Sequence, residues 1–99
     1  MLFVKIHKSY RDVVSICDCE LIGKYFEEGK FQLDAKESFY KGEEFDEEKT
    51  KEIIKKMSVE DVTFNIIGKK AIQCAIDSGI ISEKGVKKIK GVPFALVLL

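Results

Sequence analysis

Tryptophan is absent from this sequence of 99 residues, and proline, histidine and arginine each occur once, as Pro93, His7 and Arg11. No apolar run approaches the roughly 20 residues that span a bilayer. Lys5 and His7 interrupt the apolar residues at the N-terminus, which excludes a signal peptide. We therefore expect a soluble, cytoplasmic protein with no membrane partner.

Cysteine is scarce as well, and the three cysteines do not make a disulfide framework. Cys17 and Cys19 flank Asp18, so on a strand their sulfurs would lie on one face, roughly 7 Å apart. A zinc site needs four ligands, and only His7 and Cys74 remain to complete one. We expect no metal and no cofactor, and we interpret the cysteines as small buried or half-buried side chains.

Net charge is also lacking, because 17 basic residues balance 17 acidic ones. The charges are distributed unevenly: residues 20–61 carry 13 acidic and 8 basic side chains, whereas residues 62–99 carry 6 lysines and 2 acids. This asymmetry indicates either an anionic partner for the basic C-terminal third or two ordinary solvated faces. The abundance of Lys and Glu with few amides is typical of thermophile proteins, or of an AT-rich genome.

The first residues predict a β-hairpin. Apolar and polar residues alternate from Leu2 to Lys8, and a second alternating run follows the short turn at Ser9–Arg11. A three-residue loop would pair Ile6 with Val14 and Val4 with Ile16. The two strands would then share one continuous apolar face.

Two helices are predicted in the second half of the chain. Asp46 is placed to cap a helix that ends near Met57, with acids in its first turn and lysines in its last. Asn65 is placed to cap a second helix that runs to about Ser78, and Gly79 is a natural C′ residue. The charges of the first helix are explained by helix stability alone, so we assign it no catalytic carboxylate.

The remaining segments are shorter. Residues 20–30 indicate a helical turn or loop, Phe31–Asp34 a short strand, and Phe39–Gly42 a turn with a buried aromatic pair. Phe94–Leu99 has no polar face, which predicts an inner strand covered on both faces, or by helices on one face and loops on the other. The prediction is one domain, residues 1–99, of the α+β class, with a mixed or antiparallel sheet, an N-terminal β-hairpin and two helices packed on it.

Several chemistries are excluded by the spacing of residues. A phosphate-binding P-loop needs a glycine five residues before Gly68 and Ser or Thr after Lys69, but those positions hold Thr63 and Lys70. His7 has no evident nucleophile partner. An enzyme is therefore the least favoured class, and it would have to use Cys17, Cys19 and His7.

The strongest functional signal is the lysine content of the C-terminal third. Lysine binds phosphate as a point charge, without selectivity among bases. Gly91 and Pro93 would shape the loop that presents these side chains. The candidate nucleic-acid-binding residues are Lys69, Lys70, Lys84, Lys87, Lys88 and Lys90.

The order and spacing of four segments resemble the small archaeal family called domain of unknown function 424. The segments are FVKIHKSYRDVVSICD, LIGKYFEEGKFQLDAKESFYKGE, NIIGKKAIQCAIDSGII and GVPFALV, which together cover nearly the whole chain. The resemblance implies an archaeal cytoplasmic protein, in a family sometimes described as RNA-binding, and it implies no catalytic residues. The resemblance implies that many relatives carry His where this chain has Phe94, a departure that argues against an acid/base role for this position.

Two hypotheses follow. The first is a small RNA-binding or translation-associated protein that contacts RNA or the ribosome through the six lysines. The second is a protein-interaction module in which the acidic helix Asp46–Met57, or the loop Phe39–Glu43, docks a basic partner. A homodimer through an exposed sheet edge is one version of the second hypothesis.

Overall fold

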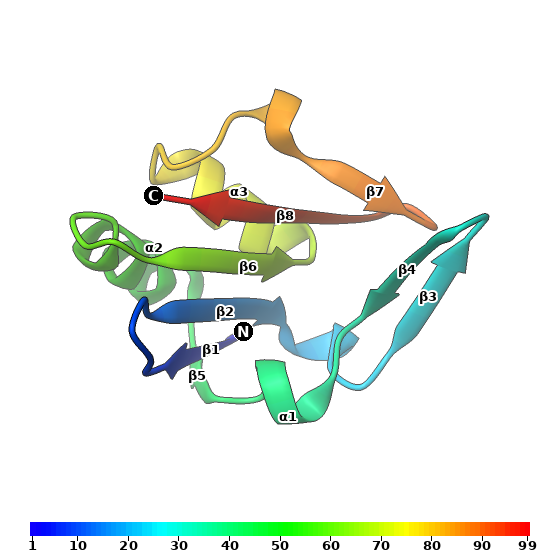
Figure 1. Ribbon diagram of the computed structural model, residues 1–99, viewed down its shortest axis with the longest axis horizontal. Coiled ribbons are helices and arrows are strands. Elements are labelled where there is room, and N and C mark those ends of the chain that lie inside the picture. The colour runs from blue at the N-terminus through cyan, green and yellow to red at the C-terminus, as the bar shows by residue number, and fades with distance from the viewer.

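A six-stranded mixed sheet forms the centre of the fold (Figure 1). The computed structural model describes residues 1–99. In spatial order the strands are β5 (Glu43–Phe45), β1 (Leu2–His7), β2 (Val13–Asp18), β6 (Thr63–Ile67), β8 (Val92–Leu98) and β7 (Lys87–Ile89). Only β2 and β6 pair in parallel; every other neighbouring pair is antiparallel. The predicted α+β class with a mixed sheet is confirmed.

The N-terminal hairpin has the predicted register. Ile6 lies opposite Val14, and Val4 lies opposite Ile16. Because the side-chain period of a strand is two, this register sends Val4 and Ile6 to the same face as Val14 and Ile16. The hairpin and its pairing are therefore confirmed.

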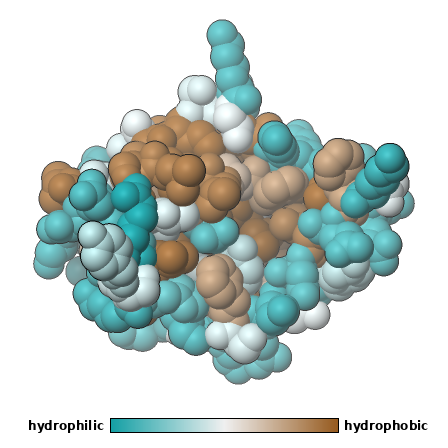
Figure 2. Space-filling view, in the orientation of Figure 1, coloured by the Kyte–Doolittle hydropathy of each residue, from teal (hydrophilic) through white to brown (hydrophobic).

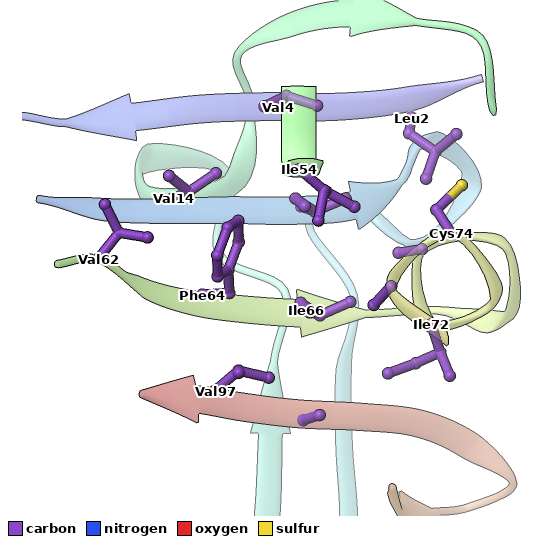
Figure 3. Close-up of a cluster of buried hydrophobic side chains, with 14 residues drawn as sticks. Leu2, Val4, Val14, Ile54, Val62, Phe64, Ile66, Ile72, Cys74 and Val97 are labelled. Atoms are coloured by element: carbon purple, nitrogen blue, oxygen red, sulfur yellow. The ribbon is translucent and has the colours of Figure 1, made fainter. Parts of the chain in front are cut away.

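Two helices cover that face, α2 (Glu47–Met57) and α3 (Lys69–Asp77), and the main core lies between them and the sheet (Figure 3). Phe64 and Ile54 are among the fully buried side chains that fill it. The predicted start of α2 is confirmed, since Asp46 Oδ1 accepts a hydrogen bond from the Lys49 backbone N–H at 2.8 Å.

The predicted start of α3 was wrong, and its predicted end was right. Asn65 lies inside β6, and the helix begins only at Lys69. At the other end, Gly79 has a φ of 80°, as expected at C′. The Gly79 N–H bonds the Ile76 carbonyl and the Ile80 N–H bonds the Ala75 carbonyl, which closes the last turn.

A smaller layer covers one end of the opposite face. It consists of the hairpin β3 (Tyr25–Glu28) and β4 (Phe31–Asp34), the short helix α1 (Glu37–Tyr40) and the 3-10 turn Cys19–Leu21. Leu33 and Tyr40 are buried there against Cys17 and Ile67. The β4 prediction is confirmed. The expectation of a loop or helical turn at β3 was wrong, because pairing with β4 holds these residues extended.

The rest of this face is open. Leu96 and Leu98 on β8 are 61% and 69% exposed, although β8 is an inner strand between β6 and β7. Figure 2 shows apolar side chains gathered over β8 on this face. The expectation that β8 is covered on both faces was therefore wrong, because the second layer reaches only one end of the sheet.

The lysine-rich segment before β8 is mainly a strand. Lys87–Ile89 forms β7, preceded by the 3-10 turn Glu83–Gly85, and the turn into β8 consists of Lys90 and Gly91. Pro93 is a buried residue of β8 and not part of a loop.

None of the helices has the length and apolar character needed to cross a membrane.

Candidate nucleic-acid interface

The six C-terminal lysines are all exposed. None of their ammonium groups lies within 4.0 Å of a carboxylate; the ion pairs of the chain involve Lys8, Lys41, Lys49 and Lys51 instead. The six ammonium groups therefore form no direct ion pair within the chain. They are available to an external anion without breaking an existing contact.

Two of these lysines line one groove between α3 and β7, which we call the α3–β7 groove. Its volume is about 500 Å³. Lys69 comes from the first turn of α3 and Lys88 from β7, so the fold brings together two charges that are distant in the sequence. The groove is lined by Lys69, Ile72, Gln73, Ile76, Glu83, Val86, Lys88, Gly91 and Pro93.

A smaller groove of about 220 Å³ adjoins the first and shares Lys69, Gly91 and Pro93 with it. Lys70 lines this groove, but so do the acidic side chains of Asp18 and Glu20. Two carboxyl groups beside the lysines make this groove a poorer site for phosphate than the α3–β7 groove.

The other three lysines occupy different surfaces. Lys87 and Lys88 are successive strand residues, so their side chains leave opposite faces of the sheet. Lys88 faces α3, which places Lys87 on the open face, opposite Phe94 in the register. Lys84 lies in the 3-10 turn before β7. Lys90 lies in the β7–β8 turn with φ 53°, where its backbone N–H donates to Glu28 Oε1 at 2.7 Å.

The N-terminus of α3 does not offer its backbone N–H groups freely to a phosphate. Asp18, at the end of β2, accepts hydrogen bonds from the N–H of Lys70 at 3.1 Å and of Ala71 at 2.8 Å. The chain's own carboxylate thus takes the place of a bound anion. Burial raises the pKa of the Asp18 carboxyl, against the effect of the two N–H donors, which lower it.

Gly68 makes this arrangement possible. It has a φ of 115°, and a Cβ atom built there would lie 2.3 Å from Asp18 Cγ. Sequence reasoning missed both residues. The only signal was that a carboxylate ends one strand and a glycine ends another, and their proximity depends on the parallel pairing of β2 with β6.

The cysteines and His7 do not form the reactive cluster considered for an enzyme. Burial raises the pKa of the Cys17 thiol to about 12 and that of Cys74 to about 11. Such thiols are protonated at neutral pH, whereas a nucleophile must be a thiolate. The structure also brings no three His, Cys, Asp or Glu side chains together as a metal site.

His7 instead contacts a residue that the sequence did not suggest. Its Nε2 lies 3.2 Å from Ser15 Oγ and 3.0 Å from the Phe39 carbonyl oxygen, and its ring stacks on Phe39. Ser15 is fully buried and donates its own hydroxyl hydrogen to Phe39 O at 2.8 Å. A substrate cannot reach this serine, so the contacts fasten α1 to the sheet.

The comparisons with known proteins agree with this fold. Residues 7–99 match the family described as "Protein of unknown function (DUF424)". The chain belongs to this family. The resemblance inferred from the four sequence segments is thereby confirmed.

One solved structure of the same fold is a crystal structure of an uncharacterized conserved protein from Methanopyrus kandleri. It is 24% identical to this chain, with a TM-score of 0.83, and the match covers 98% of this chain and 91% of that chain. At this identity the likeness establishes the fold alone. No curated protein matches the chain significantly.

Proposed function

We propose that the protein binds RNA, through the phosphate backbone, at the end of the molecule where α3, β7 and the β7–β8 turn meet. The observation that carries this proposal is that six exposed lysines without ion pairs lie on α3, on β7 and in the turns that flank β7. Lys69 and Lys88 line one groove, whereas Lys87 lies on the opposite face of the sheet. Lysines without bound carboxylates replace the counterions of a nucleic acid at little cost. A role in translation or on the ribosome is the setting we propose for this activity.

The test is a fluorescence-anisotropy titration with structured ribosomal RNA fragments at two salt concentrations. We expect a Kd near the micromolar range at low salt. About four phosphate contacts predict a loss of roughly 100-fold in affinity between about 50 and 200 mM salt. The variant Lys69→Glu/Lys88→Glu should abolish most binding and reduce the slope of log affinity against log salt by about 2.

The matched control is Lys24→Glu/Lys36→Glu, which makes the same change in net charge at two exposed lysines that flank the β3–β4 hairpin at its end away from the β7–β8 turn. Glutamate in the first turn of a helix interacts favourably with the helix dipole, so Lys69→Glu should not unfold α3. If both double variants weaken binding equally, the interaction is non-specific attraction to net charge, and the proposed site is wrong.

The exposed leucines of β8 favour a second candidate function, self-association. Exposed apolar side chains on a sheet face mark protein contacts, whereas the edge strands β5 and β7 are three residues long and carry Glu43, Glu44, Lys87 and Lys88. A homodimer through the open face is therefore better supported than one through an edge. Sedimentation velocity should show a dimer that Leu98→Lys abolishes; a monomer at all concentrations would contradict it.

A further inference from the structure

The α3–β7 groove is lined by polar and apolar residues, and the phosphate contacts do not use its apolar part. Ile72 and Ile76 of α3 form one side, and Val86 and Pro93 form the other. The α3 residues that line it, Lys69, Ile72, Gln73 and Ile76, follow the helical spacing of one face, so the groove runs along the helix. Its volume of about 500 Å³ lies within the range of small-molecule sites, roughly 300–1,000 Å³.

We propose that this groove receives one unpaired nucleotide of the bound RNA, with the base against Ile72, Ile76 and Val86 and its phosphate on Lys69 and Lys88. The inference rests on the proposed RNA binding and adds the class of RNA that is bound. A base inside a duplex is stacked and paired, so only its backbone reaches the rim of such a groove. An unpaired nucleotide can cover the apolar part of the groove and contact both lysines.

The polar side chains of the groove suit a base better than a bare anion. Glu83 lines the groove, and its side chain makes no hydrogen bond or ion pair within the chain, which disfavours a second phosphate beside it. Gln73 uses its Nε2 on Asp77 Oδ1 at 2.8 Å, which leaves its carbonyl oxygen as an acceptor. Both groups accept hydrogen bonds from the amino groups of bases.

The test compares a single-stranded RNA oligonucleotide with a blunt duplex of the same sequence by fluorescence anisotropy. We expect the single strand to bind at least tenfold more tightly than the duplex. The decisive variant is Ile76→Lys, which adds a positive charge but replaces the apolar surface. It should weaken single-strand binding about tenfold and leave duplex binding unchanged or stronger.

The control is Val59→Lys, which adds the same charge at a residue that is 82% exposed on the loop after α2. Lysine at position 76 keeps an apolar stem, which limits the loss of stability. Val86→Lys makes the same change on the opposite side of the groove, and is used if thermal unfolding shows that Ile76→Lys is not folded.

The outcomes separate the two proposals. Equal binding of single strand and duplex, both abolished by Lys69→Glu/Lys88→Glu, overturns the unpaired nucleotide and leaves RNA binding standing. Single-strand binding that Ile76→Lys leaves intact or strengthens overturns it as well. If neither RNA binds the wild type, the proposed function fails, and this inference fails with it.

Discussion

An aspartate carboxylate caps the first turn of both α2 and α3, but it is close in the sequence for α2 and far away in the sequence for α3. At the start of α2, Asp46 accepts the N–H of Lys49 at 2.8 Å, from within the same turn. At the start of α3, Asp18 accepts the N–H of Ala71, also at 2.8 Å, from another strand of the sheet. A helix start needs its free N–H groups satisfied, but the acceptor does not have to be a neighbour in the sequence.

The two carboxylates make similar hydrogen bonds but differ in how deeply they are buried. Asp46 is exposed, so water can replace it if it is lost. Asp18 is only 3% exposed, and it lies against Gly68 with no room for a further atom. The distant cap therefore supports both the helix and the junction of two strands, whereas the local cap supports only its own helix.

The largest expected effect comes from Gly68→Ala. The new Cβ would collide with the Asp18 carboxyl group, and the φ of 115° is strained for any residue but glycine. We expect a loss of at least about 3 kcal/mol in the free energy of unfolding, measured by urea denaturation. Gly79→Ala is the control: its φ is also positive, but a Cβ there meets nothing within 4 Å, so the loss should be about 1–2 kcal/mol. Equal losses would contradict the close approach to Asp18.

Asp18→Ala should have the next largest effect. It leaves two backbone N–H groups of α3 without a partner in a buried place, which costs about 2–3 kcal/mol. Asp46→Ala removes the exposed cap and should cost about 1 kcal/mol. Urea denaturation of both variants checks the ranking, and a loss at Asp46 as large as that at Asp18 would remove the distinction between them.

The smallest expected effect is on how the free energy of unfolding depends on pH. Asp18 contributes to this dependence in the wild type, and the variant Asp18→Asn lacks that contribution. Burial raises the folded-state pKa of Asp18 above its ordinary value of 3.8, so the folded chain holds this proton more tightly than the unfolded chain. The contribution is fully present below pH 3.8 and is lost as the pH rises through the folded-state pKa. The stability of wild type relative to Asp18→Asn should therefore decline with rising pH. A difference that grows with pH would show that the two N–H donors outweigh burial.

Local patterns in the sequence predicted the parts of the fold that local interactions determine. The hairpin register followed from alternation on both sides of a short turn, and α2 followed from its own cap and first-turn acids. The end of α3 was predicted in the same way, from Gly79, whose positive φ suits the residue that follows a helix. Each of these signals acts over a few residues, so no knowledge of the tertiary structure was needed.

The errors occurred where distant segments decide the structure. Asn65 is a good cap by type, but pairing of β6 with both β2 and β8 holds it in a strand. Tyr25–Glu28 has no clear alternation and becomes a strand through β4. The candidate site shows the same limit. Its lysines were visible in the composition, but their division between the α3–β7 groove and the open face depends on which way β7 faces.

The single parallel pair in the sheet has a consequence for how the molecule forms. The hairpins β1–β2 and β7–β8 close over short loops, whereas pairing β2 with β6 closes the much longer segment from Cys19 to Val62, at a higher cost in conformational entropy. We expect this junction to form late in folding. The φ-value from folding kinetics, which is the fraction of a mutation's effect on stability already present in the folding barrier, should be nearer 1 at Ile6, which pairs only with β2, than at Ile66. Since Asp18 and Gly68 meet at the same junction, the last strands to join would also be the ones that start α3.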